Sequence, residues 1–499
     1  MNFLNDIKYA LFPEIIISML IIINCFIAFL VPKDKQDKVF FLNFFGIAAA
    51  LGSLGIVASQ NFHYAFYNSF LSDNLTLIFS TLILLGCFIT LLMTKQYIKL
   101  WSDYKTEFYT LLLTSILGAL LLCGAVDLVM IFIAIETLSI PAYILSGFSK
   151  SDKFSNEAAL KYFVLGGVSS AIFLYGLSIL YGIAGSTNLV NIHQFTANMP
   201  DNALLILSML FILVGLFFKL TAFPLHVWAP DVYTGAPLPV AAFLSVVSKM
   251  AGFAILIRIL INIYSHNVFA AIFIGMVAIL TMTIGNLGAV TQTDLRRIMA
   301  YSSIAQAGYI LAGIAVLNKI GMSASIFYIV CYLFMNFGAW SAIELFINKT
   351  GKTAIKDLQG LAYSNMPLSL SFTLCLLSLA GLPLTAGFWG KFYLFSSIFL
   401  AGPLFLPLFI IALINTVVGL YYYTKIIKSM FVKPLNGCSF NHNILKKPIY
   451  INTALLFCCI FVIIIGFVAS PFITITQKTV ISVSNSDNSI KRLNYFYKK

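Results

Sequence analysis

Charged residues are scarce in this sequence. Only 9% of the 499 residues are Asp, Glu, Lys or Arg, against roughly a quarter in ordinary globular domains, and 60% are hydrophobic. A soluble fold with so few charges could not cover its own surface. The composition therefore excludes a soluble protein and predicts an all-α, polytopic bundle of transmembrane helices.

Motifs that hold redox centres and metal ions are also missing. The eight cysteines form no CxxC, and all but Cys438 fall in apolar runs, so neither an iron–sulfur cluster nor a zinc site is indicated. No G-x-G-x-x-G follows a predicted strand, so dinucleotide binding is not indicated either. The cysteines are interpreted as small buried hydrophobes, and no metal or organic cofactor is expected on this chain.

The net charge of +13 does not indicate a nucleic-acid partner. The basic residues lie in short loops between apolar segments, and there is no basic patch interleaved with aromatics on a soluble domain. Most of the 30 Lys and Arg residues lie in loops that follow odd-numbered spans. The positive-inside rule then places these loops in the cytoplasm and both termini outside.

Long apolar runs are abundant. One crossing of the bilayer needs about 20 apolar residues. The first run is too long for a signal peptide and has no A-x-A cleavage site, so it is expected to stay as a span. Fourteen spans are predicted, near residues 10–31, 38–58, 74–94, 108–126, 128–148, 160–184, 203–225, 237–263, 268–291, 300–317, 322–346, 367–400, 404–431 and 450–472.

Two of these spans are expected to be broken. The seventh contains Pro224, which would remove a helical hydrogen bond to the carbonyl of Leu220. The twelfth would be about 51 Å long as a single helix, far longer than the hydrocarbon core. It contains LAGLPLTAGFWGKF, in which several glycines and Pro383 can interrupt a helix. Paired broken helices in inverted repeats mark the transport path of secondary transporters.

The two breaks lie five spans apart, and tandem duplication of a five-span unit inverts the second copy. The sequence therefore predicts two inverted five-helix repeats, each with one broken helix. Four regions are expected: residues 1–107 with three spans, 108–263 with the first repeat, 264–431 with the second, and 432–499 with the last span and a loosely ordered polar tail after residue 472.

Four ionisable residues lie far inside the predicted spans: Glu136, Lys219, Lys249 and Lys391. A charge at the centre of the bilayer costs roughly 2.5–3.5 kcal/mol on insertion scales, so such residues usually serve a function. A structural ion pair or an interfacial anchor is the alternative for each of them. Desolvation makes an amine release its proton more readily, and a nearby carboxylate opposes this effect. Together the four residues indicate a proton relay in which Glu136 controls the proton on Lys219.

Weaker candidates lie close to these four. His226 could pass protons between the central amines, although a satisfied structural imidazole is as good an interpretation. Asp231 is expected to organise the turn after the seventh span. Tyr301, Ser302 and Ser303 open the tenth span and could line a wet path.

Three further charges are interpreted without a functional role. Arg258 is expected to extend its side chain towards the membrane surface from a position near the end of the eighth span. Glu14 and Glu344 lie near the ends of spans and are expected at the interface with water.

Several long strings carry a family resemblance. The chain resembles the N subunit of the respiratory NADH–quinone oxidoreductase, complex I, together with its mitochondrial and cyanobacterial or plastid counterparts. The strings are LVMIFIAIETLSIPAYILSGF, SNEAALKYFVLGG, FKLTAFPLHVWAPDVYTGAP, RRIMAYSSIAQAGY, LPLTAGFWGKFYLF and LYYYTKIIKSMF. They extend from about the third span to the thirteenth.

The resemblance implies an antiporter-like, proton-translocating subunit of a translocase. It implies that Glu136 and Lys219 match the family's paired carboxylate and lysine, that Lys249 matches the central lysine, and that Lys391 matches the lysine of the second broken helix. Related M subunits and sodium/proton antiporter subunits typically have Glu at the position of Lys391, which favours N. One departure is Gln306, where some relatives carry His, because an amide cannot take up a proton at ordinary pH.

The resemblance also implies partners. FMN, iron–sulfur clusters, NADH and quinone are expected on other subunits, namely the hydrophilic redox arm that this chain reaches through its membrane-arm neighbours. A bacterial plasma membrane is expected, with a thylakoid or mitochondrial inner membrane as the alternative. An autonomous or multisubunit cation/proton antiporter is the alternative function, because it would share the same charges and broken helices.

Overall fold

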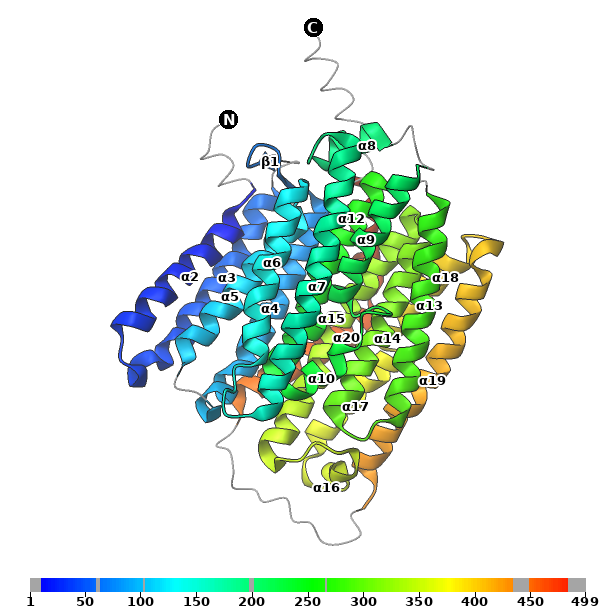
Figure 1. Cartoon of the computed structure of the whole chain (residues 1–499). Helices are drawn as coiled ribbons and strands as arrows, with labels where there is room; N and C mark the ends of the chain where they lie inside the picture. The colour runs from blue at the N-terminus through cyan, green and yellow to red at the C-terminus, as the bar shows by residue number, and fades with distance from the viewer. Residues whose placement is uncertain are drawn as a thin grey trace.

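Inside a bilayer every backbone N–H and C=O must find a partner within the chain, and an α-helix achieves this segment by segment. The computed structural model describes residues 10–59, 63–101, 104–196, 202–264, 267–433 and 448–482. These residues form a bundle of long helices whose axes are roughly aligned (Figure 1). Thirteen helices of the described chain are long and apolar enough to cross a membrane. The predicted all-α membrane fold is therefore confirmed.

The N-terminal part is helical apart from one short hairpin. Its elements are α2 (Phe12–Leu30), η1 (Lys33–Lys38), α3 (Val39–Ala58), β1 (His63–Ala65), β2 (Phe70–Ser72) and α4 (Asn74–Trp101). The two strands pair antiparallel, with Tyr64 opposite Leu71.

The middle of the chain holds the first predicted repeat. Its elements are α5 (Lys105–Gly124), α6 (Leu128–Ser146), α7 (Lys153–Ala184), α8 (Leu189–Thr196), α9 (Ala203–Leu220), α10 (Trp228–Gly235), α11 (Leu238–Phe243), the π-helical turn η2 (Leu244–Ser248) and α12 (Lys249–Ile263). The segment Leu238–Ile263 is enclosed by other helices along its whole length.

The remaining elements include the second predicted repeat. They are α13 (Val268–Thr291), α14 (Leu295–Ala315), α15 (Lys319–Thr350), η3 (Ile355–Leu358), α16 (Leu361–Ser364), α17 (Met366–Ala380), α18 (Ala386–Phe399), η4 (Pro403–Phe405), α19 (Leu406–Phe431) and α20 (Ile449–Phe467). A further helix covers residues 470–482, so the first part of the predicted loose tail is helical, and residues 483–499 lie outside the described chain.

Both predicted helix breaks are present, but the prolines do not cause them in the way expected. Helix α9 ends at Leu220 because Thr221 adopts a left-handed conformation with φ 56°, and α17 ends at Ala380 because Gly381 does the same with φ 89°. Each of these residues donates its N–H back to the last turn of the helix. Pro224 and Pro383 follow the helix ends and lie in the turns, where a missing N–H costs nothing.

Paired local features support an internal duplication. Asp127 caps the start of α6 and forms a bridge to Asn188, and Asp294 caps the start of α14 and forms a bridge to Ala354. The helix before each cap also carries a glycine at the crossing point. A Cβ on Gly118 of α5 would strike the backbone of α6, and a Cβ on Gly285 would strike the backbone of α14.

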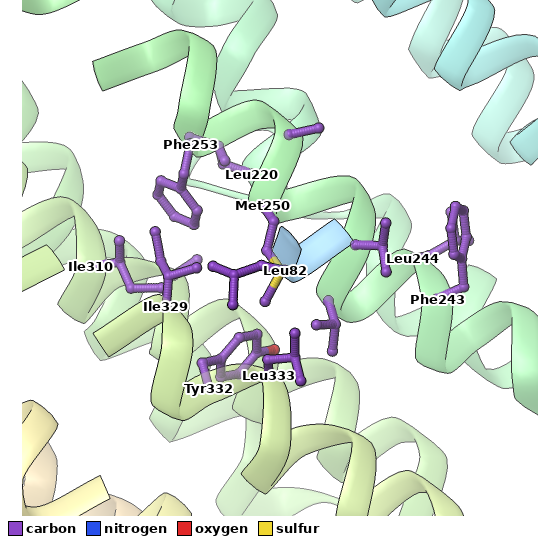
Figure 2. Close-up of a cluster of buried hydrophobic side chains, with 14 of the residues drawn as sticks. Leu82, Leu220, Phe243, Leu244, Met250, Phe253, Ile310, Ile329, Tyr332 and Leu333 are labelled. Carbon is purple, nitrogen blue, oxygen red and sulfur yellow. The ribbon is translucent and has the colours of Figure 1, made fainter. Parts of the chain in front are cut away.

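The centre of the bundle is apolar and densely packed. Figure 2 shows side chains that converge on one another from seven elements: Leu82, Leu220, Phe243, Leu244, Met250, Phe253, Ile310, Ile329, Tyr332 and Leu333. All of them are buried. Polar groups that pass through this region are therefore shielded from bulk water by hydrocarbon.

Arg258 is not extended to the membrane surface, contrary to expectation. Its side chain is 1% exposed and makes a two-pronged ion pair with Asp73, with N–O distances of 3.0 and 2.9 Å. The guanidinium also donates to the hydroxyl of Thr76 and to the carbonyl of Cys123. Each of the three guanidinium nitrogens thus has a hydrogen-bond acceptor. These contacts hold α12 against the start of α4 and the end of α5.

This ion pair leads to a first prediction. Asp73→Leu alone leaves a buried, unpaired guanidinium, and Arg258→Met alone leaves a buried carboxylate, so each should destabilise the chain by about 3–5 kcal/mol. The double variant removes both charges and should recover most of that loss. Thermal unfolding of the purified assembly measures the effect. Single variants as stable as the native chain would contradict the assigned role.

Candidate functional site

Glu136 and Lys219 lie on neighbouring helices but make no ion pair among the described residues. Lys219 occupies the last turn of α9, is 4% exposed, and donates from Nζ to the hydroxyl of Ser139 on α6. The ring of Tyr143, one turn further along α6, lies 5.6 Å from the same Nζ. Ser139 follows Glu136 by three residues and so stands on the same helix face. The amine of Lys219 is thus held on the face of α6 that carries Glu136, but it bonds to Ser139 and not to the carboxylate.

Glu136 reaches outward from this position. Its carboxylate accepts a hydrogen bond of 2.5 Å from Ser170 on α7, and the residue is only half-buried. Ile133 and Ile140, on the same helix, are 52% and 51% exposed. Because a half-exposed carboxylate on an apolar surface is costly in lipid, this face of α6 suits a protein neighbour better than hydrocarbon.

Lys249 is the most enclosed of the four residues. It begins α12 directly after the π-helical turn η2, and 2% of its surface is exposed. Its Nζ donates to the carbonyl of Ser303 at 2.7 Å and to the hydroxyl of Ser303 at 3.0 Å. Gly252, one turn on, packs against the Cβ of Lys219, so the two lysine-bearing segments adjoin.

Gln306 is the centre of a hydrogen-bonded cluster. Its Nε2 donates to the carbonyl of Leu379 at 3.2 Å and to the hydroxyl of Tyr423 at 3.1 Å, while its Oε1 accepts from the hydroxyl of Tyr328. The Tyr423 hydroxyl also lies 2.5 Å from the hydroxyl of Ser302. The amide thus orients a chain of hydroxyls without being able to carry a proton as a titrating group.

Lys391 lies beyond the second helix break and turns back towards it. Its Nζ donates to the carbonyls of Leu379 and Ala380, both at 3.0 Å, and the ring of Tyr309 lies 4.9 Å from it. These carbonyls end α17, where the helix dipole is negative and favours a cation. The residue is 4% exposed. The broken helix therefore creates the binding place for this amine.

The described contacts join two of the lysines into one line. From Lys249 the line passes to Ser303, then through the adjacent Ser302 to Tyr423, to Gln306, and by the carbonyl of Leu379 to Lys391. Its links are the hydrogen bonds given above, except that Ser303 and Ser302 are joined only as neighbours in the chain, and the carbonyl of Leu379 accepts from both Gln306 and Lys391. Tyr301, which precedes these serines, is only half-buried. Of the three residues predicted to line a wet path at the start of the tenth span, Ser302 and Ser303 belong to this line and are fully buried.

The weaker candidates stand apart from this line. His226 lies in the turn between α9 and α10, and its buried Nδ1 has no hydrogen-bond partner in the described chain. It bonds to none of the four residues. Asp231 forms ion pairs with Lys161 at 2.7 Å and with Arg297 at 3.2 Å, which ties α10 to α7 and α14. The expected structural role of Asp231 thus agrees with its contacts.

Glu14 and Glu344 were expected at the water interface, and both are instead enclosed by helices. Glu14 is 5% exposed and Glu344 is 0% exposed. The cysteines fit their interpretation better: six of the seven in the described chain are buried, Cys25 is exposed, and Cys438 lies outside the described residues. Among the described residues, no group of His, Cys, Asp and Glu is placed to hold a metal ion.

Sequence reasoning missed the groups that connect the ionisable residues. Tyr309, Tyr328 and Tyr423 are common residue types in an apolar helix, and nothing in their spacing pointed to one shared cluster. Ser139 could have been found, because it stands three residues after Glu136 and so faces the same neighbour.

Comparison with known proteins agrees with this geometry. The family described as "NADH:quinone oxidoreductase/Mrp antiporter, TM" matches residues 125–418. The chain is 41% identical to NAD(P)H-quinone oxidoreductase subunit 2 of Acaryochloris marina over 485 residues, which cover 95% of this chain and 92% of that protein. It is 44% identical to the subunit of the same name from Synechococcus elongatus over 395 residues, covering 78% and 74%.

Solved structures show the same fold. A chain of respiratory complex I from Thermus thermophilus with bound aureothin is 29% identical with a TM-score of 0.78, covering 93% of this chain and 98% of that one. A chain of the Mrp complex from Dietzia sp. DQ12-45-1b is 20% identical with a TM-score of 0.83, covering 96% and 98%. Taken with the matched residues, these similarities show that this multi-pass membrane protein belongs to the NADH:quinone oxidoreductase/Mrp antiporter family.

Proposed function

We propose that this chain is a proton-translocating membrane-arm subunit of an NADH–quinone oxidoreductase of the complex I type. One observation carries the proposal: three buried amines and one carboxylate lie within an apolar helix bundle, where Lys219 bonds to a hydroxyl and a series of hydroxyl, amide and carbonyl groups lies between Lys249 and Lys391. The chain's similarity to NAD(P)H-quinone oxidoreductase subunit 2 supports the same assignment. Within the complex it takes the position of the N subunit, which Lys391 favours over the related M subunit.

The arrangement can move protons by electrostatic coupling. Like charges repel strongly where the dielectric constant is low, so a proton on one lysine favours proton release from the next. Hydroxyl groups both donate and accept, and therefore they can pass a proton between amines. Glu136 opposes release from Lys219 when it is charged and permits release when it is neutral. A change at Glu136 is thereby transmitted along the line.

The electron-transfer chemistry belongs to partners under this proposal. FMN, iron–sulfur clusters, NADH and quinone would be held by other subunits, because the sequence has neither a dinucleotide-binding motif nor a cysteine cluster. The half-exposed Glu136 marks α6 as a face for a membrane-arm neighbour. The redox arm would act on this chain through such neighbours.

The orientation in the membrane follows from the basic loops. We place the loops after odd-numbered spans in the cytoplasm and both termini outside, in a bacterial plasma membrane. In a thylakoid or mitochondrial membrane the same loops would face the stroma or the matrix.

A cation/proton antiporter that works without redox partners is the second candidate, and the shared fold with the Mrp complex favours it. Purification from the native membrane separates the two. Co-purification with hydrophilic redox subunits supports the proposal. Cation/proton exchange by the isolated chain in liposomes would overturn it.

The two helix-end carbonyls that bind Lys391 lead to a prediction. Lys391→Ala should leave the complex assembled but lower proton uptake by about tenfold or more, the low end of what a positioned proton-transfer group contributes. Lys391→Arg should not restore it, because a guanidinium does not deprotonate in proteins. Proton uptake by vesicles that contain the whole complex is the measurement. Native uptake in the Arg variant would show that this site need not release its proton.

A double variant tests whether Glu136 and Lys219 act as one unit. Glu136→Gln should cut proton uptake, and Glu136→Asp should keep part of it because the charge remains. Residues that act together show non-additive effects, so Glu136→Gln with Lys219→Ala should be little worse than the worse single change.

Proton uptake and quinone reduction are followed in parallel in vesicles for the native chain, for the Glu136→Gln, Glu136→Asp and Lys219→Ala variants, and for the double variant. The transmembrane potential contributes roughly 2.3 kcal/mol per charge per 100 mV, so the test is done with and without an uncoupler. Losses that simply add in the double variant would disprove the coupling.

Gln306 offers a test of the connecting line. Gln306→Leu keeps the side-chain volume but removes both the donor to Leu379 and the acceptor for Tyr328, so transfer between Lys249 and Lys391 should slow by about tenfold or more. Gln306→His can donate and accept and should retain more activity. The proton-to-electron ratio in vesicles reports the effect. Equal ratios in the Leu variant and the native chain would remove Gln306 from the path.

A further inference from the structure

Helix α15 carries a polar side chain at every fourth position over most of its length. Positions four apart lie on one ridge that winds slowly around a helix. The helix is otherwise apolar and almost entirely enclosed. We call this row the α15 ridge; its members are Tyr328, Tyr332, Asn336, Trp340, Glu344 and Asn348.

The first half of the α15 ridge joins the relay described above. Tyr332 donates to the carbonyl of Ser245 at 3.1 Å, and Asn336 donates to the hydroxyl of Ser245 at 2.9 Å. Ser245 lies in η2, one turn before Lys249. The ring of Tyr332 packs in the apolar centre of the molecule, as Figure 2 shows. The ridge is therefore hydrogen-bonded directly to Ser245, which lies one helical turn before the central lysine.

The second half of the α15 ridge has no such partners. In the described chain the indole Nε1 of Trp340 is buried without a hydrogen bond, and the buried carboxylate of Glu344 has only the amide of Asn348, one turn on along the same helix, as a neighbouring donor, at a separation longer than a regular hydrogen bond. The hydroxyl of Ser341 beside them is also buried without a hydrogen bond. Buried polar groups in proteins are nearly always hydrogen-bonded, and where no protein atom serves, ordered water does. A row of such groups is suited to line a path for ordered water.

This half leads to the end of the bundle that carries the basic loops. Asn348 is half-buried, and the next residue, Lys349, is exposed. Glu344 is six residues from the end of α15, or about 9 Å along the helix axis. The ridge thus extends from the C-terminal end of α15 to the centre of the bundle.

The groups that face Glu344 do not neutralise it. Two charged residues at the basic-loop end of the bundle, Arg296 and Asp152, are already engaged. Arg296 is paired with Asp294 at 3.4 Å, and Asp152 caps the start of α7. No ion pair involving Glu344 is present among the described residues. A carboxylate without a partner charge is costly to bury, and ionisable residues inside membrane segments usually serve a function.

We propose that Glu344 is the proton-loading group of an entry path that follows the α15 ridge from the basic-loop end of the bundle to Lys249. This inference rests on the proposed function and names a route by which the relay is supplied. Glu344 takes a proton from water at the mouth near Asn348 and passes it inward. Trp340, Asn336 and Tyr332 orient the carrying water and hydroxyls, and the free amine of Lys249 accepts the proton. No group is oxidised or reduced in this transfer.

Matched variants in the whole complex test the assignment. Glu344→Gln keeps the shape and removes the exchangeable proton, so proton uptake per electron should fall by about tenfold or more, and Glu344→Asp should keep part of it. Glu157→Gln is the control, because Glu157 is on the same side of the membrane but exposed and paired with Lys161. It should behave as the native complex. Native uptake in Glu344→Gln would overturn the proposal.

Two further measurements guard against a loss that is merely structural. Trp340→Phe keeps an aromatic ring but removes the unpartnered N–H together with part of the buried indole, so it should slow uptake, and assembly of the complex is checked in the same sample. The infrared difference spectrum between resting and reducing complex should contain a protonated-carboxyl band that Glu344→Gln removes and Glu157→Gln keeps. If no such band depends on Glu344, the carboxyl does not exchange its proton and the proposal fails.

Variants Lys249→Ala and Lys391→Ala, measured beside these, separate this inference from the proposed function. If both lysine variants take up protons normally, the chain does not translocate protons and the proposed function itself is wrong. If both lose uptake while Glu344→Gln does not, the relay stands and only the entry path along the α15 ridge is refuted.

Discussion

A charge enclosed in hydrocarbon must be met by polar atoms of the chain itself, and most of this structure follows from that requirement. Lys219 meets a hydroxyl, Lys249 a serine, and Lys391 the open end of a helix. Arg258 is satisfied by a carboxylate and a carbonyl, which makes it a fastening rather than a carrier. A guanidinium keeps its proton whatever its partner. For an amine the partner matters: a neutral acceptor leaves its proton free to depart, and a full countercharge would hold it.

The fold could be predicted from the sequence because hydropathy alone decides which segments enter the bilayer. The helix breaks were predicted from glycine and proline, yet their cause was misassigned: the left-handed residues Thr221 and Gly381 end the helices, and the prolines occupy the turns that follow. Conformations of this kind depend on the next segment's packing, which a local reading of the sequence does not contain. The early start of α7 at Lys153 was missed for a similar reason, because charged residues in its first turns interrupt the apolar run.

The four central residues of the candidate site could also be found from the sequence, since a lone charge in an apolar run is conspicuous. Their connections could not. The Gln306 cluster brings together residues more than a hundred positions apart, such as Tyr423. The positions of Arg258 and Glu344 were predicted wrongly because the distance of a residue from the end of a span says little about what covers its side chain. Arg258 pairs with Asp73, which is far away in the sequence, and Glu344 is surrounded by other helices.

The glycine crossings of α5 with α6 and of α13 with α14 have a mechanical consequence. At each crossing one backbone lies so near the other that a single methyl group would not fit between them. Sliding either helix along its partner would bring bulkier residues into that gap. Each pair therefore behaves as one rigid body. Coupling between distant sites through these pairs has to occur by a rearrangement of charge and not by helices that slide along one another.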